Sequence, residues 1–305
     1  MCPVSRLTPA MRRELEDSGC EVRFDDLTRR LYATDASIYQ LEPDAVAFPR
    51  SSHEVSRLLA AARAHGLPVI PRGAGTGLAG GAIGEGLVVE LARHSRWIRE
   101  LDLECRTVRV GAGVVLDQLN RYLEPHGLMF GPDVATGSRA TVGGMVANNS
   151  SGARSPVWGT TADHLVGAEV VLSDGRVAEI GDGCHDLAEL RRDVSAAVCG
   201  ASAEIRRRMP PGLVKRWPGY AFDRALASPD DLSRLVAGSE GTLVAVTSAR
   251  LRVVERPRQR GLGVIFFASV DEAMTAAVEI LDLGPAAVEH VDRLVLDQTR
   301  GQREF

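Results

Sequence analysis

The chain has 305 residues, of which 45 % are hydrophobic and 25 % are charged. This composition is typical of a soluble globular protein and excludes a disordered, collagenous or coiled-coil chain. The 36 basic and 40 acidic residues leave a net charge of −4, without the clustered positive charge that attracts nucleic acid, so we expect no nucleic-acid partner. No stretch approaches the roughly 18 to 20 apolar residues of a membrane helix, and the N-terminus lacks an apolar signal core, so we expect a cytoplasmic protein.

Cysteine and histidine spacing gives no sign of a metal site. The cysteines are widely separated and form no C-x-x-C pair, and no two of the seven histidines are spaced like zinc ligands on one element. We expect no bound metal, and isolated reduced thiols at Cys2, Cys20, Cys105, Cys184 and Cys199.

The first predicted elements form a strand, a helix and a strand. An apolar run at 45–48 precedes Ser51 and Glu54, a capping-box pair that predicts the start of a helix. Apolar residues then recur at helical spacing until Gly66, which can end the helix, and a second apolar run covers 67–70. This order predicts a βαβ unit with parallel strands.

The middle of the chain mixes helical and strand patterns. We predict strands at 87–91 and 107–111, a helix at 114–123, and a hairpin over 168–180 with its turn at the Asp-Gly pair 174–175. The chain up to about residue 250 is therefore predicted to be α+β, with parallel and antiparallel strands mixed.

A polar, proline-containing stretch at 255–258 changes the composition of the chain and predicts a linker. After it we predict a strand at 262–268, a helix at 272–283, a strand at 286–289 and a further helix toward Phe305. A single unit of this kind cannot cover both faces of its small sheet. We therefore expect the chain to be a fragment, or its second domain to be incomplete.

A glycine-rich segment at 71–81 directly follows a predicted strand. Its glycines alternate at Gly73, Gly75 and Gly77, so the backbone can adopt positive φ and present successive N–H groups to an anion such as a pyrophosphate. The dinucleotide fingerprint G-x-G-x-x-G fails because its third glycine would fall at Leu78, and no P-loop lysine follows. As a pattern alone, the segment fits a flexible turn equally well.

A second glycine-rich segment spans 131–152 and consists of small, polar residues with little charge. We predict a buried loop, because a solvated tail would carry more charge. The backbone and hydroxyl groups of a buried loop need hydrogen-bond partners, and a polar ligand lying alongside would supply them.

Three segments, at 72–81, 131–163 and 238–243, together resemble the FAD-linked oxidases of the vanillyl-alcohol oxidase superfamily. They lie in the family's order and spacing over about residues 20–290. Within the superfamily they look most like the D-2-hydroxyacid dehydrogenase branch, which includes D-lactate dehydrogenase, the flavin subunit of glycolate oxidase and D-2-hydroxyglutarate dehydrogenase.

The resemblance implies a domain organisation of the α+β class. A PCMH-type FAD-binding domain would cover residues 1–255, with two α/β subdomains at about 20–105 and 106–255. Residues 256–305 would be the truncated start of a ferredoxin-like substrate (cap) domain.

The resemblance also implies FAD as the cofactor. The implied cofactor-binding residues are Arg72, Gly73, Ala74, Gly75, Thr76, Gly77, Leu78, Gly80, Gly81, Pro132, Asp133, Thr136, Gly137, Ser138, Thr141, Gly143, Gly144, Asn148, Asn149, Gly152, Gly159, Asp163, Glu240, Gly241 and Val246. Trp158 stands where the family commonly has tyrosine, and Val244 where it usually has glycine. Members with covalent flavin carry a histidine in the first segment, and none lies between Arg72 and Ala82, so we expect non-covalent FAD.

For the activity, the resemblance implies oxidation of a D-2-hydroxyacid such as lactate, glycolate or 2-hydroxyglutarate, with hydride passing to flavin N5. Electrons would continue to a separate acceptor, which is a quinone, a cytochrome, a flavoprotein, or an iron–sulfur protein or domain. The reaction needs a base and a cation for the substrate carboxylate, roles that suit histidine and arginine. In the family the base lies in the distal half of the substrate domain, so we expect the catalytic residues beyond Phe305.

Two other functions stay open. The chain could be a flavin-binding module that is catalytically silent alone, or a relative that uses the same fold for ether-lipid synthesis or aldonolactone oxidation. The resemblance also allows a homodimer, and a peripheral place at the inner membrane through the electron acceptor.

Further residues have two interpretations each. His164 either orients a loop through hydrogen bonds, which we favour, or takes part in chemistry. Arg154 and Arg224 either face substrate or, as we favour, are ordinary exposed arginines. The segment 215–220 resembles the stretch that precedes the cap domain, but a surface loop is the favoured interpretation.

Overall fold

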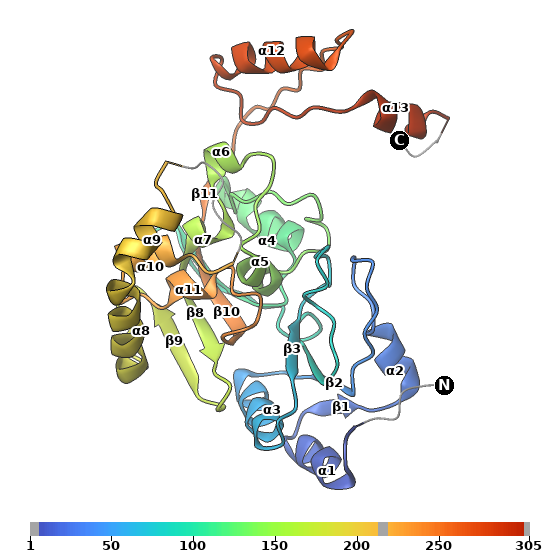
Figure 1. Cartoon of the computed structure of the whole chain (residues 1–305), viewed down its shortest axis with the longest axis vertical. Helices are drawn as coiled ribbons and strands as arrows, with labels where there is room; N and C mark the ends of the chain where they lie inside the picture. The colour runs from blue at the N-terminus through green and yellow to red at the C-terminus, as the bar shows by residue number, and fades with distance from the viewer. Residues whose placement is uncertain (1–5, 213–218, 302–305) are drawn as a thin grey trace.

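The computed structural model describes residues 6–212 and 219–301 of the chain. Two main β-sheets pack against each other, each with helices beside it, and a segment with two helices extends from them toward the C-terminus (Figure 1). One sheet has the strand order β1-β2-β4-β3, and the other has the order β5-β6-β10-β8-β9. This arrangement confirms the predicted α+β class.

The four-stranded sheet contains the predicted βαβ unit. Its strands are β1 (Glu21–Arg23), β2 (Ala45–Phe48), β3 (Val69–Arg72) and β4 (Leu87–Glu90). β4 lies between β2 and β3 and runs parallel to both, whereas β1 is antiparallel to β2. The predicted parallel direction is therefore confirmed, although the two strands of the unit are not neighbours.

Helix α3 (Ser52–Ala64) connects β2 to β3 and begins where the sequence predicts. Ser51 Oγ accepts a hydrogen bond from Glu54 N at 3.2 Å, and Gly66 follows the helix with a φ of 62°. The apolar face of α3 is buried in a cluster that also contains residues of β8 and β10. This cluster joins the two sheets and fixes their relative position.

The five-stranded sheet is antiparallel throughout. Its strands are β5 (Ile98–Asp102), β6 (Thr107–Gly111), β8 (Leu165–Val171), β9 (Val177–Gly181) and β10 (Ala245–Arg252). The predicted hairpin is confirmed between β8 and β9, with Gly175 at a φ of 87°. β10 comes from far along the chain and lies in the centre of the sheet, between β6 and β8.

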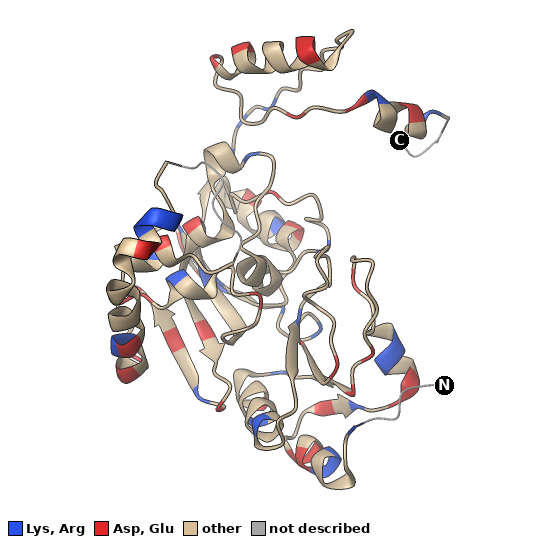
Figure 2. Cartoon of the chain, viewed as in Figure 1, with Lys and Arg blue, Asp and Glu red and all other residues tan. Residues whose placement is uncertain are grey.

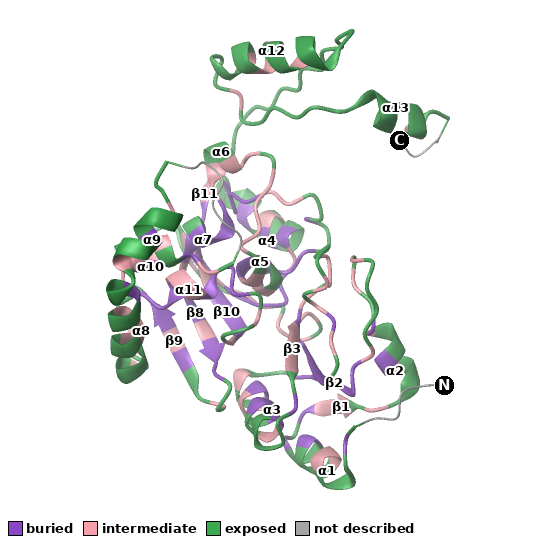
Figure 3. Cartoon of the chain, viewed as in Figure 1, coloured by how far each residue is buried: buried purple, intermediate pink, exposed green. Residues whose placement is uncertain are grey.

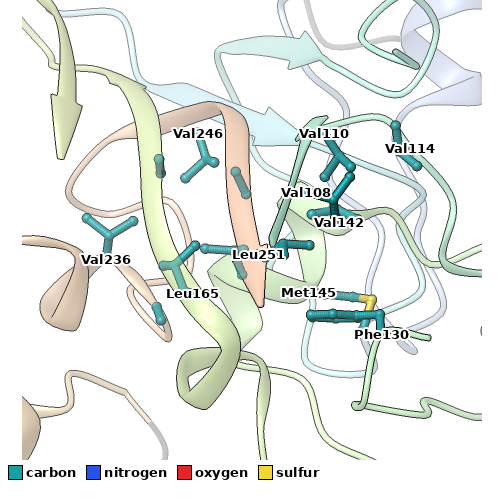
Figure 4. Close-up of a cluster of buried hydrophobic side chains, with 14 of the residues drawn as sticks. Val108, Val110, Val114, Phe130, Val142, Met145, Leu165, Val236, Val246 and Leu251 are labelled. Atoms are coloured by element: carbon teal, nitrogen blue, oxygen red, sulfur yellow. The ribbon is translucent and has the colours of Figure 1, made fainter. Parts of the chain in front are cut away.

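One face of this sheet forms the larger core. Val108 and Val110 on β6 and Leu251 on β10 are fully buried with Val142 and Met145 of α5 (Val142–Asn148), as Figure 4 shows. Helix α4 (Leu116–Leu123) contributes its apolar face to the same cluster. Each such side chain contributes about 1.5–3 kcal/mol by leaving water, so this core holds α5 firmly against the sheet.

The remaining elements surround the two sheets. They are α1 (Pro9–Asp17), α2 (Asp26–Leu31), the 3₁₀ helix η1 (Glu124–His126), β7 (Leu128–Met129), α6 (Ser155–Trp158), α7 (Thr161–His164), α8 (Ala188–Gly200), α9 (Ser202–Arg208), α10 (Phe222–Ala227), α11 (Ser233–Val236) and β11 (Val254–Glu255). β11 pairs antiparallel with β7. Among the helices of residues 6–212 and 219–301, none has the length and apolar character needed to span a membrane.

The prediction of a loop throughout 131–152 is wrong, because α5 forms within it. Thr141 occupies the N-cap position, and Val142, Met145 and Val146 are buried at helical spacing. These apolar residues stand among glycines, which have low helix propensity, and packing against the sheet outweighs that propensity.

The two strands predicted at 262–268 and 286–289 do not form. The helix predicted between them is confirmed as α12 (Val270–Leu281), and the helix predicted beyond them as α13 (Arg293–Thr299). Leu262 and Phe266 are 91 % and 82 % exposed, and Figure 3 shows this segment as almost entirely exposed. A strand needs a hydrogen-bonding neighbour, and within the described part of the chain no strand pairs with these runs.

Candidate functional site

A cavity of about 260 Å³ lies where three segments meet: the loop after β3, the region of α5, and the loop before β10. Its lining residues are Pro71, Arg72, Gly73, Ala74, Gly75, Thr76, Gly77, Leu78, Ala79, Gly81, Ala82, Leu91, Ala112, Val134, Thr136, Ala140, Thr141, Gly143, Gly144, Met145, Ala147, Asn148, Ser150, Ser151, Ser239, Glu240, Gly241, Val244 and Val246. These residues come from both sheets, so the packing of the sheets against each other forms the cavity.

The glycine-rich loop lines the cavity with backbone groups. Within the described residues, no backbone N–H from Ala74 to Gly81 donates a hydrogen bond to another residue. The carbonyl oxygen of Gly75 accepts a hydrogen bond from Ala36 N at 2.9 Å, which anchors the loop. A Cβ at Gly77 or Gly81 would meet no other atom within 4 Å. The loop therefore offers a series of free donors, as an anion-binding nest does.

Arg72 stands at the start of this loop, and its guanidinium is bound to the backbone. Nη1 donates to Tyr32 O at 3.2 Å and to Ala82 O at 2.8 Å, and Nη2 donates to Thr34 O at 2.7 Å. Burial lowers the pKa of Arg72, but arginine remains protonated at neutral pH. Arg72 thus lines the cavity while its donors are directed to carbonyl groups of the protein.

Thr141 brings a buried hydroxyl to the cavity. It is 2 % exposed, and its Oγ1 has no hydrogen-bond partner among the described residues. A Cβ on Gly73 would overlap this oxygen, so a glycine is needed where the loop approaches α5. A buried hydroxyl without a partner costs about 1–3 kcal/mol, and a polar ligand in the cavity would supply the missing partner.

The start of α5 packs tightly against the end of β6. Gly143 N donates to Ala112 O at 2.8 Å, and a Cβ on Gly143 would lie 2.7 Å from the Ala112 Cβ. Gly143 and Ala112 both line the cavity. Gly143 has no side chain, so the backbone of α5 comes close to the glycine-rich loop on this side of the helix.

The loop before β10 lines a third side of the cavity and has a left-handed backbone at three positions. Gly238, Glu240 and Gly241 have φ values of 89°, 51° and 78°, in the left-handed region that L residues rarely occupy. Gly238 N donates to Val146 O at 3.0 Å, and Glu240 N donates to Ala147 O at 2.8 Å. These bonds fix the loop to the end of α5 and place Glu240 and Gly241 at the cavity.

The structure gathers most of the predicted cofactor-binding residues around this cavity. Those in its lining are Arg72, Gly73, Ala74, Gly75, Thr76, Gly77, Leu78, Gly81, Thr136, Thr141, Gly143, Gly144, Asn148, Glu240, Gly241 and Val246. Those outside its lining are Gly80, Pro132, Asp133, Gly137, Ser138, Asn149, Gly152, Gly159 and Asp163. Several of the second group have local partners: Asn149 Oδ1 accepts a hydrogen bond from Ala162 N at 2.9 Å, and Gly152 packs closely against the carbonyl oxygen of Asp133.

Asp163 belongs to a structural cluster beside α7. Its carboxylate accepts hydrogen bonds from Thr160 N at 2.7 Å and Thr160 Oγ1 at 3.0 Å, and it pairs with Arg224 at 2.7 Å. Burial acts to raise the pKa of Asp163, but the Thr160 hydrogen bonds and the Arg224 charge outweigh it and lower the pKa below its ordinary value. The carboxylate therefore holds this part of the chain together. The expectation that Arg224 is an ordinary exposed arginine is wrong, because its side chain is only 9 % exposed and is a partner of Asp163.

The other candidate side chains also have protein partners. His164 lies 2.6 Å from Trp158 O through Nε2 and 3.1 Å from Arg252 O through Nδ1. These contacts agree with the favoured, loop-orienting interpretation of His164. Arg154 pairs with Asp133 at 3.2 Å.

The segment 215–220 enters the structure only in part. Residues 215–218 lie outside the described residues, as does Cys2. The Tyr220 hydroxyl lies 2.6 Å from Thr242 Oγ1, which donates to Ser239 O at 2.6 Å. The described end of the segment therefore contacts the loop before β10.

Sequence reasoning missed several lining residues: Pro71, Ala79, Ala82, Leu91, Ala112, Val134, Ala140, Met145, Ala147, Ser150, Ser151, Ser239 and Val244. Ser150 lies inside the segment 131–163 and Ser239 inside the segment 238–243, so these motifs could have predicted them. Leu91 and Ala112 simply follow strands, and only the packing of the two sheets brings them to the cavity.

The cavity is largely uncharged. Figure 2 shows α5 without charged residues, while charges gather on outer elements such as α9. In the lining, as far as the described residues go, Arg72 and Glu240 are the charged residues and histidine is absent. The lining therefore consists mainly of backbone and neutral polar groups, with one basic and one acidic side chain.

Comparison with known proteins connects this cavity to a family. Residues 43–181, which include the glycine-rich loop and α5, match the family described as FAD binding domain. The D-2-hydroxyglutarate dehydrogenase of Escherichia coli (strain K12) is 37 % identical over 306 residues, which cover 94 % of this chain and 30 % of that protein. The glycolate oxidase subunit GlcD of Bacillus subtilis (strain 168) is 32 % identical over 296 residues, covering 95 % of this chain and 55 % of that protein. Residues 43–181 therefore match an FAD binding domain, and the chain is similar to a D-2-hydroxyglutarate dehydrogenase and a glycolate oxidase subunit over part of their length.

Solved structures agree with the fold of an FAD-linked oxidase. Alkyldihydroxyacetonephosphate synthase is 20 % identical with a TM-score of 0.66, covering 94 % of this chain and 49 % of that chain. Xylooligosaccharide oxidase from Myceliophthora thermophila C1 is 19 % identical with a TM-score of 0.58, covering 81 % and 43 %. These likenesses confirm the predicted PCMH-type fold, and the chain spans only part of the length of each relative.

The residues around the cavity fit FAD, the cofactor that the family implies. The free N–H groups from Ala74 to Gly81 suit a diphosphate, and the unpartnered Thr141 hydroxyl suits a polar group next to it. Gly77 and Gly81 leave space that a side chain would fill. The chemistry of the donors and the shape of the loop therefore match a dinucleotide.

Proposed function

We propose that this chain is the FAD-binding part of an oxidoreductase that oxidises a D-2-hydroxyacid such as lactate, glycolate or 2-hydroxyglutarate. The observation that carries the proposal is the cavity at which the free N–H groups of the glycine-rich loop meet the unpartnered hydroxyl of Thr141. Relatives named D-2-hydroxyglutarate dehydrogenase and glycolate oxidase subunit support the substrate class. Bound FAD would supply the acceptor for the hydride of the substrate.

The chain's own residues would divide the binding of FAD among three segments. Backbone N–H groups of residues 73–81 would hold the diphosphate, because glycines leave these donors uncovered. Thr141 and Asn148 would bind polar atoms further along the cofactor, and Glu240 and Gly241 would close the other side of the cavity. The predicted residues that lie outside the lining would hold these three segments in place through contacts within the protein.

We propose that FAD is held without a covalent bond. The glycine-rich loop contains no histidine, and none lines the cavity in the described part of the chain. After acid precipitation of the loaded protein, the flavin is expected in the supernatant. Flavin that stays with the precipitate would overturn this part of the proposal.

The proposed domain division places the FAD-binding domain at residues 1–255 and the start of a substrate domain at 256–305. In support, the described residues after 256 stand apart from both sheets (Figure 1) and expose apolar side chains such as Phe266 and Leu283. Electrons would leave the flavin for a separate acceptor, which is a quinone, a cytochrome, a flavoprotein or an iron–sulfur protein.

A second candidate is a flavin-binding module without activity of its own. The composition of the cavity favours it: no histidine lines the cavity within the described residues, and the guanidinium of Arg72 is occupied by backbone carbonyls. Such a chain would bind FAD but lack a histidine base for the substrate hydroxyl.

One experiment tests both candidates. The 305-residue chain is purified, its visible absorption is recorded with and without added FAD, and any bound nucleotide is released and identified. The loaded protein is then mixed without oxygen with D-lactate, glycolate or D-2-hydroxyglutarate, with L-lactate as the control. Loss of oxidised-flavin absorption with a D-isomer supports the oxidoreductase, a yellow protein that stays oxidised supports the silent module, and failure to bind FAD contradicts both.

A further inference from the structure

Arg72 is a buried cation without a carboxylate partner. It is 8 % exposed, and within the described residues no carboxylate oxygen lies within 4.0 Å of it. Arg29 provides the contrast, because it is 4 % exposed and pairs with Glu42 at 3.0 Å and Asp26 at 3.3 Å. Buried arginines ordinarily have such partners. The carboxylates of Asp35 and Glu90 act on Arg72 only from beyond ion-pair distance, so the position of this cation needs an explanation.

The guanidinium of Arg72 joins the two ends of the glycine-rich loop. Arg72 is the last residue of β3, and its Nη1 donates at 2.8 Å to the carbonyl of Ala82, where the loop ends. The remaining hydrogen bonds go to Tyr32 O and Thr34 O, so the same side chain binds the loop to the segment after α2. Its Cζ also lies 5.1 Å from the centre of the Tyr32 ring.

The segment 32–36 holds the loop at further points. Ala36 N donates to Gly75 O at 2.9 Å, and Asp35 Oδ2 accepts a hydrogen bond from Ala82 N at 3.4 Å. A Cβ on Gly75 would lie 2.9 Å from Arg72 Nη2, so the guanidinium lies directly against the middle of the loop. The loop is therefore held at its start, middle and end by the side chains of Arg72 and Asp35 and by the backbone of residues 32–36.

We propose that Arg72 is the positioning residue of an anion-binding loop. Its guanidinium keeps residues 73–82 in the conformation that presents free N–H groups, and its charge, which forms no ion pair within the described residues, adds to the attraction for a bound diphosphate. Ordering the loop before binding lowers the entropic cost of binding, and a cation in a low-dielectric site attracts an anion more strongly than it would in water. The assignment of the anion to the diphosphate of FAD rests on the proposed function.

Two variants distinguish the contribution of the Arg72 hydrogen bonds from the contribution of its charge. Arg72→Lys keeps the charge but cannot donate to three carbonyls at once, and Arg72→Met removes both. Arg29→Met is the matched control, because it removes a buried arginine, in helix α2, that does not line the cavity. For each full-length chain, the melting temperature without ligand, the Kd for FAD by quenching of flavin fluorescence, and the stabilisation by inorganic pyrophosphate are measured.

We expect the Kd for FAD to rise about 10-fold in Arg72→Lys and about 100-fold in Arg72→Met, and to change less than about twofold in Arg29→Met. Pyrophosphate should raise the melting temperature of the unaltered chain and of Arg29→Met, but not that of Arg72→Met. The spectrum of FAD at saturation should be the same in all variants that bind it, because the flavin surroundings are unchanged. If Arg72→Met does not fold, the expected rise in the Kd for FAD of Arg72→Lys tests the inference instead.

The outcomes distinguish this inference from the proposed function. If the unaltered chain binds FAD and the Arg72 variants bind it equally well, or if Arg29→Met weakens FAD binding as much as Arg72→Met does, the inference is wrong and the proposed function stands. If the unaltered chain responds to pyrophosphate in an Arg72-dependent way but does not bind FAD, the inference stands and the proposed function is wrong. A chain that responds to neither ligand overturns both.

Discussion

The glycine-rich loop and the segment 159–164 are both small, polar stretches that sequence reasoning assigned to the cofactor. In the loop, the N–H groups from Ala74 to Gly81 have no acceptor within the described residues, and they line a cavity. In the second segment, Asp163 already has Thr160 and Arg224 as partners, and neither Gly159 nor Asp163 lines the cavity. The difference teaches that polar residues of a motif are available to a ligand only where the protein has left them without partners.

The glycines of the two segments differ in the same way. A Cβ at Gly77 would meet no other atom within 4 Å, whereas a Cβ at Gly159 would lie 2.6 Å from Asp163 Oδ2 on a backbone with a φ of 71°. Gly77 leaves space for something else, and Gly159 permits a tight turn within the protein. Substitutions in the two segments should therefore have opposite effects on ligand binding and on stability.

The largest expected effect is that of Gly77→Val. A Cβ at this position meets no other atom within 4 Å, so the free energy of unfolding without ligand should change by less than about 1 kcal/mol, while the occupied space should weaken FAD binding more than about 100-fold. Gly200→Val at the end of α8 is the control, since a Cβ there also has open space but lies away from the cavity. A titration with FAD in which both variants bind equally well would show that Gly77 does not face the cofactor.

Breaking the ion pair of the second segment should reduce stability and leave binding intact. Arg224→Met removes the partner of Asp163, whose side chain is 39 % exposed, so we expect a loss of about 1–2 kcal/mol in the free energy of unfolding rather than the full cost for a buried pair. Urea denaturation measures this loss. The Kd of the folded variant for FAD should change less than about twofold, and a tenfold weakening would place the segment at the cofactor after all.

Thr141→Val should act in opposite directions on stability and on binding. The substitution keeps the shape of the side chain and removes a buried hydroxyl without a partner, so the ligand-free chain should become more stable by about 1 kcal/mol. FAD binding should weaken about 10-fold, because the cofactor loses a hydrogen bond. Thermal unfolding with and without FAD measures both effects, and weakened stability without ligand would show that the hydroxyl is satisfied within the protein.

The smallest expected effect is the pH dependence contributed by Asp163. Its pKa in the folded chain is lowered by its hydrogen bonds and by Arg224, so its ionised form favours the folded state above the unfolded pKa of about 3.9, and this stabilisation disappears as the pH falls through the folded pKa. The difference in unfolding free energy between the unaltered chain and Asp163→Asn should therefore be largest near pH 7 and shrink below about pH 4. Urea denaturation at several pH values measures it, and a constant difference would contradict the shift.

Much of the fold could be predicted because its signals are local. The Ser51 cap and Gly66 mark the ends of α3, and the Asp-Gly turn at 174–175 marks the hairpin, since capping and turn geometry depend on a few adjacent residues. The strands predicted at 262–268 and 286–289 were wrong, because a strand depends on a neighbour that may lie anywhere in the chain. The insertion of β4 between β2 and β3 escaped prediction for the same reason.

The amino-acid sequence by itself determined the α+β class, the resemblance to an FAD binding domain and the glycine-rich loop with its capacity to bind an anion, because alternating glycines specify backbone freedom locally. Only the tertiary structure decided which polar groups remain free. It placed Leu91 and Ala112 in the cavity, gave Asp163 a partner in Arg224, and directed the guanidinium of Arg72 to three carbonyls. The physical reason is that a hydrogen bond or ion pair is satisfied by whatever group packing brings within reach, and that group is often distant in the sequence.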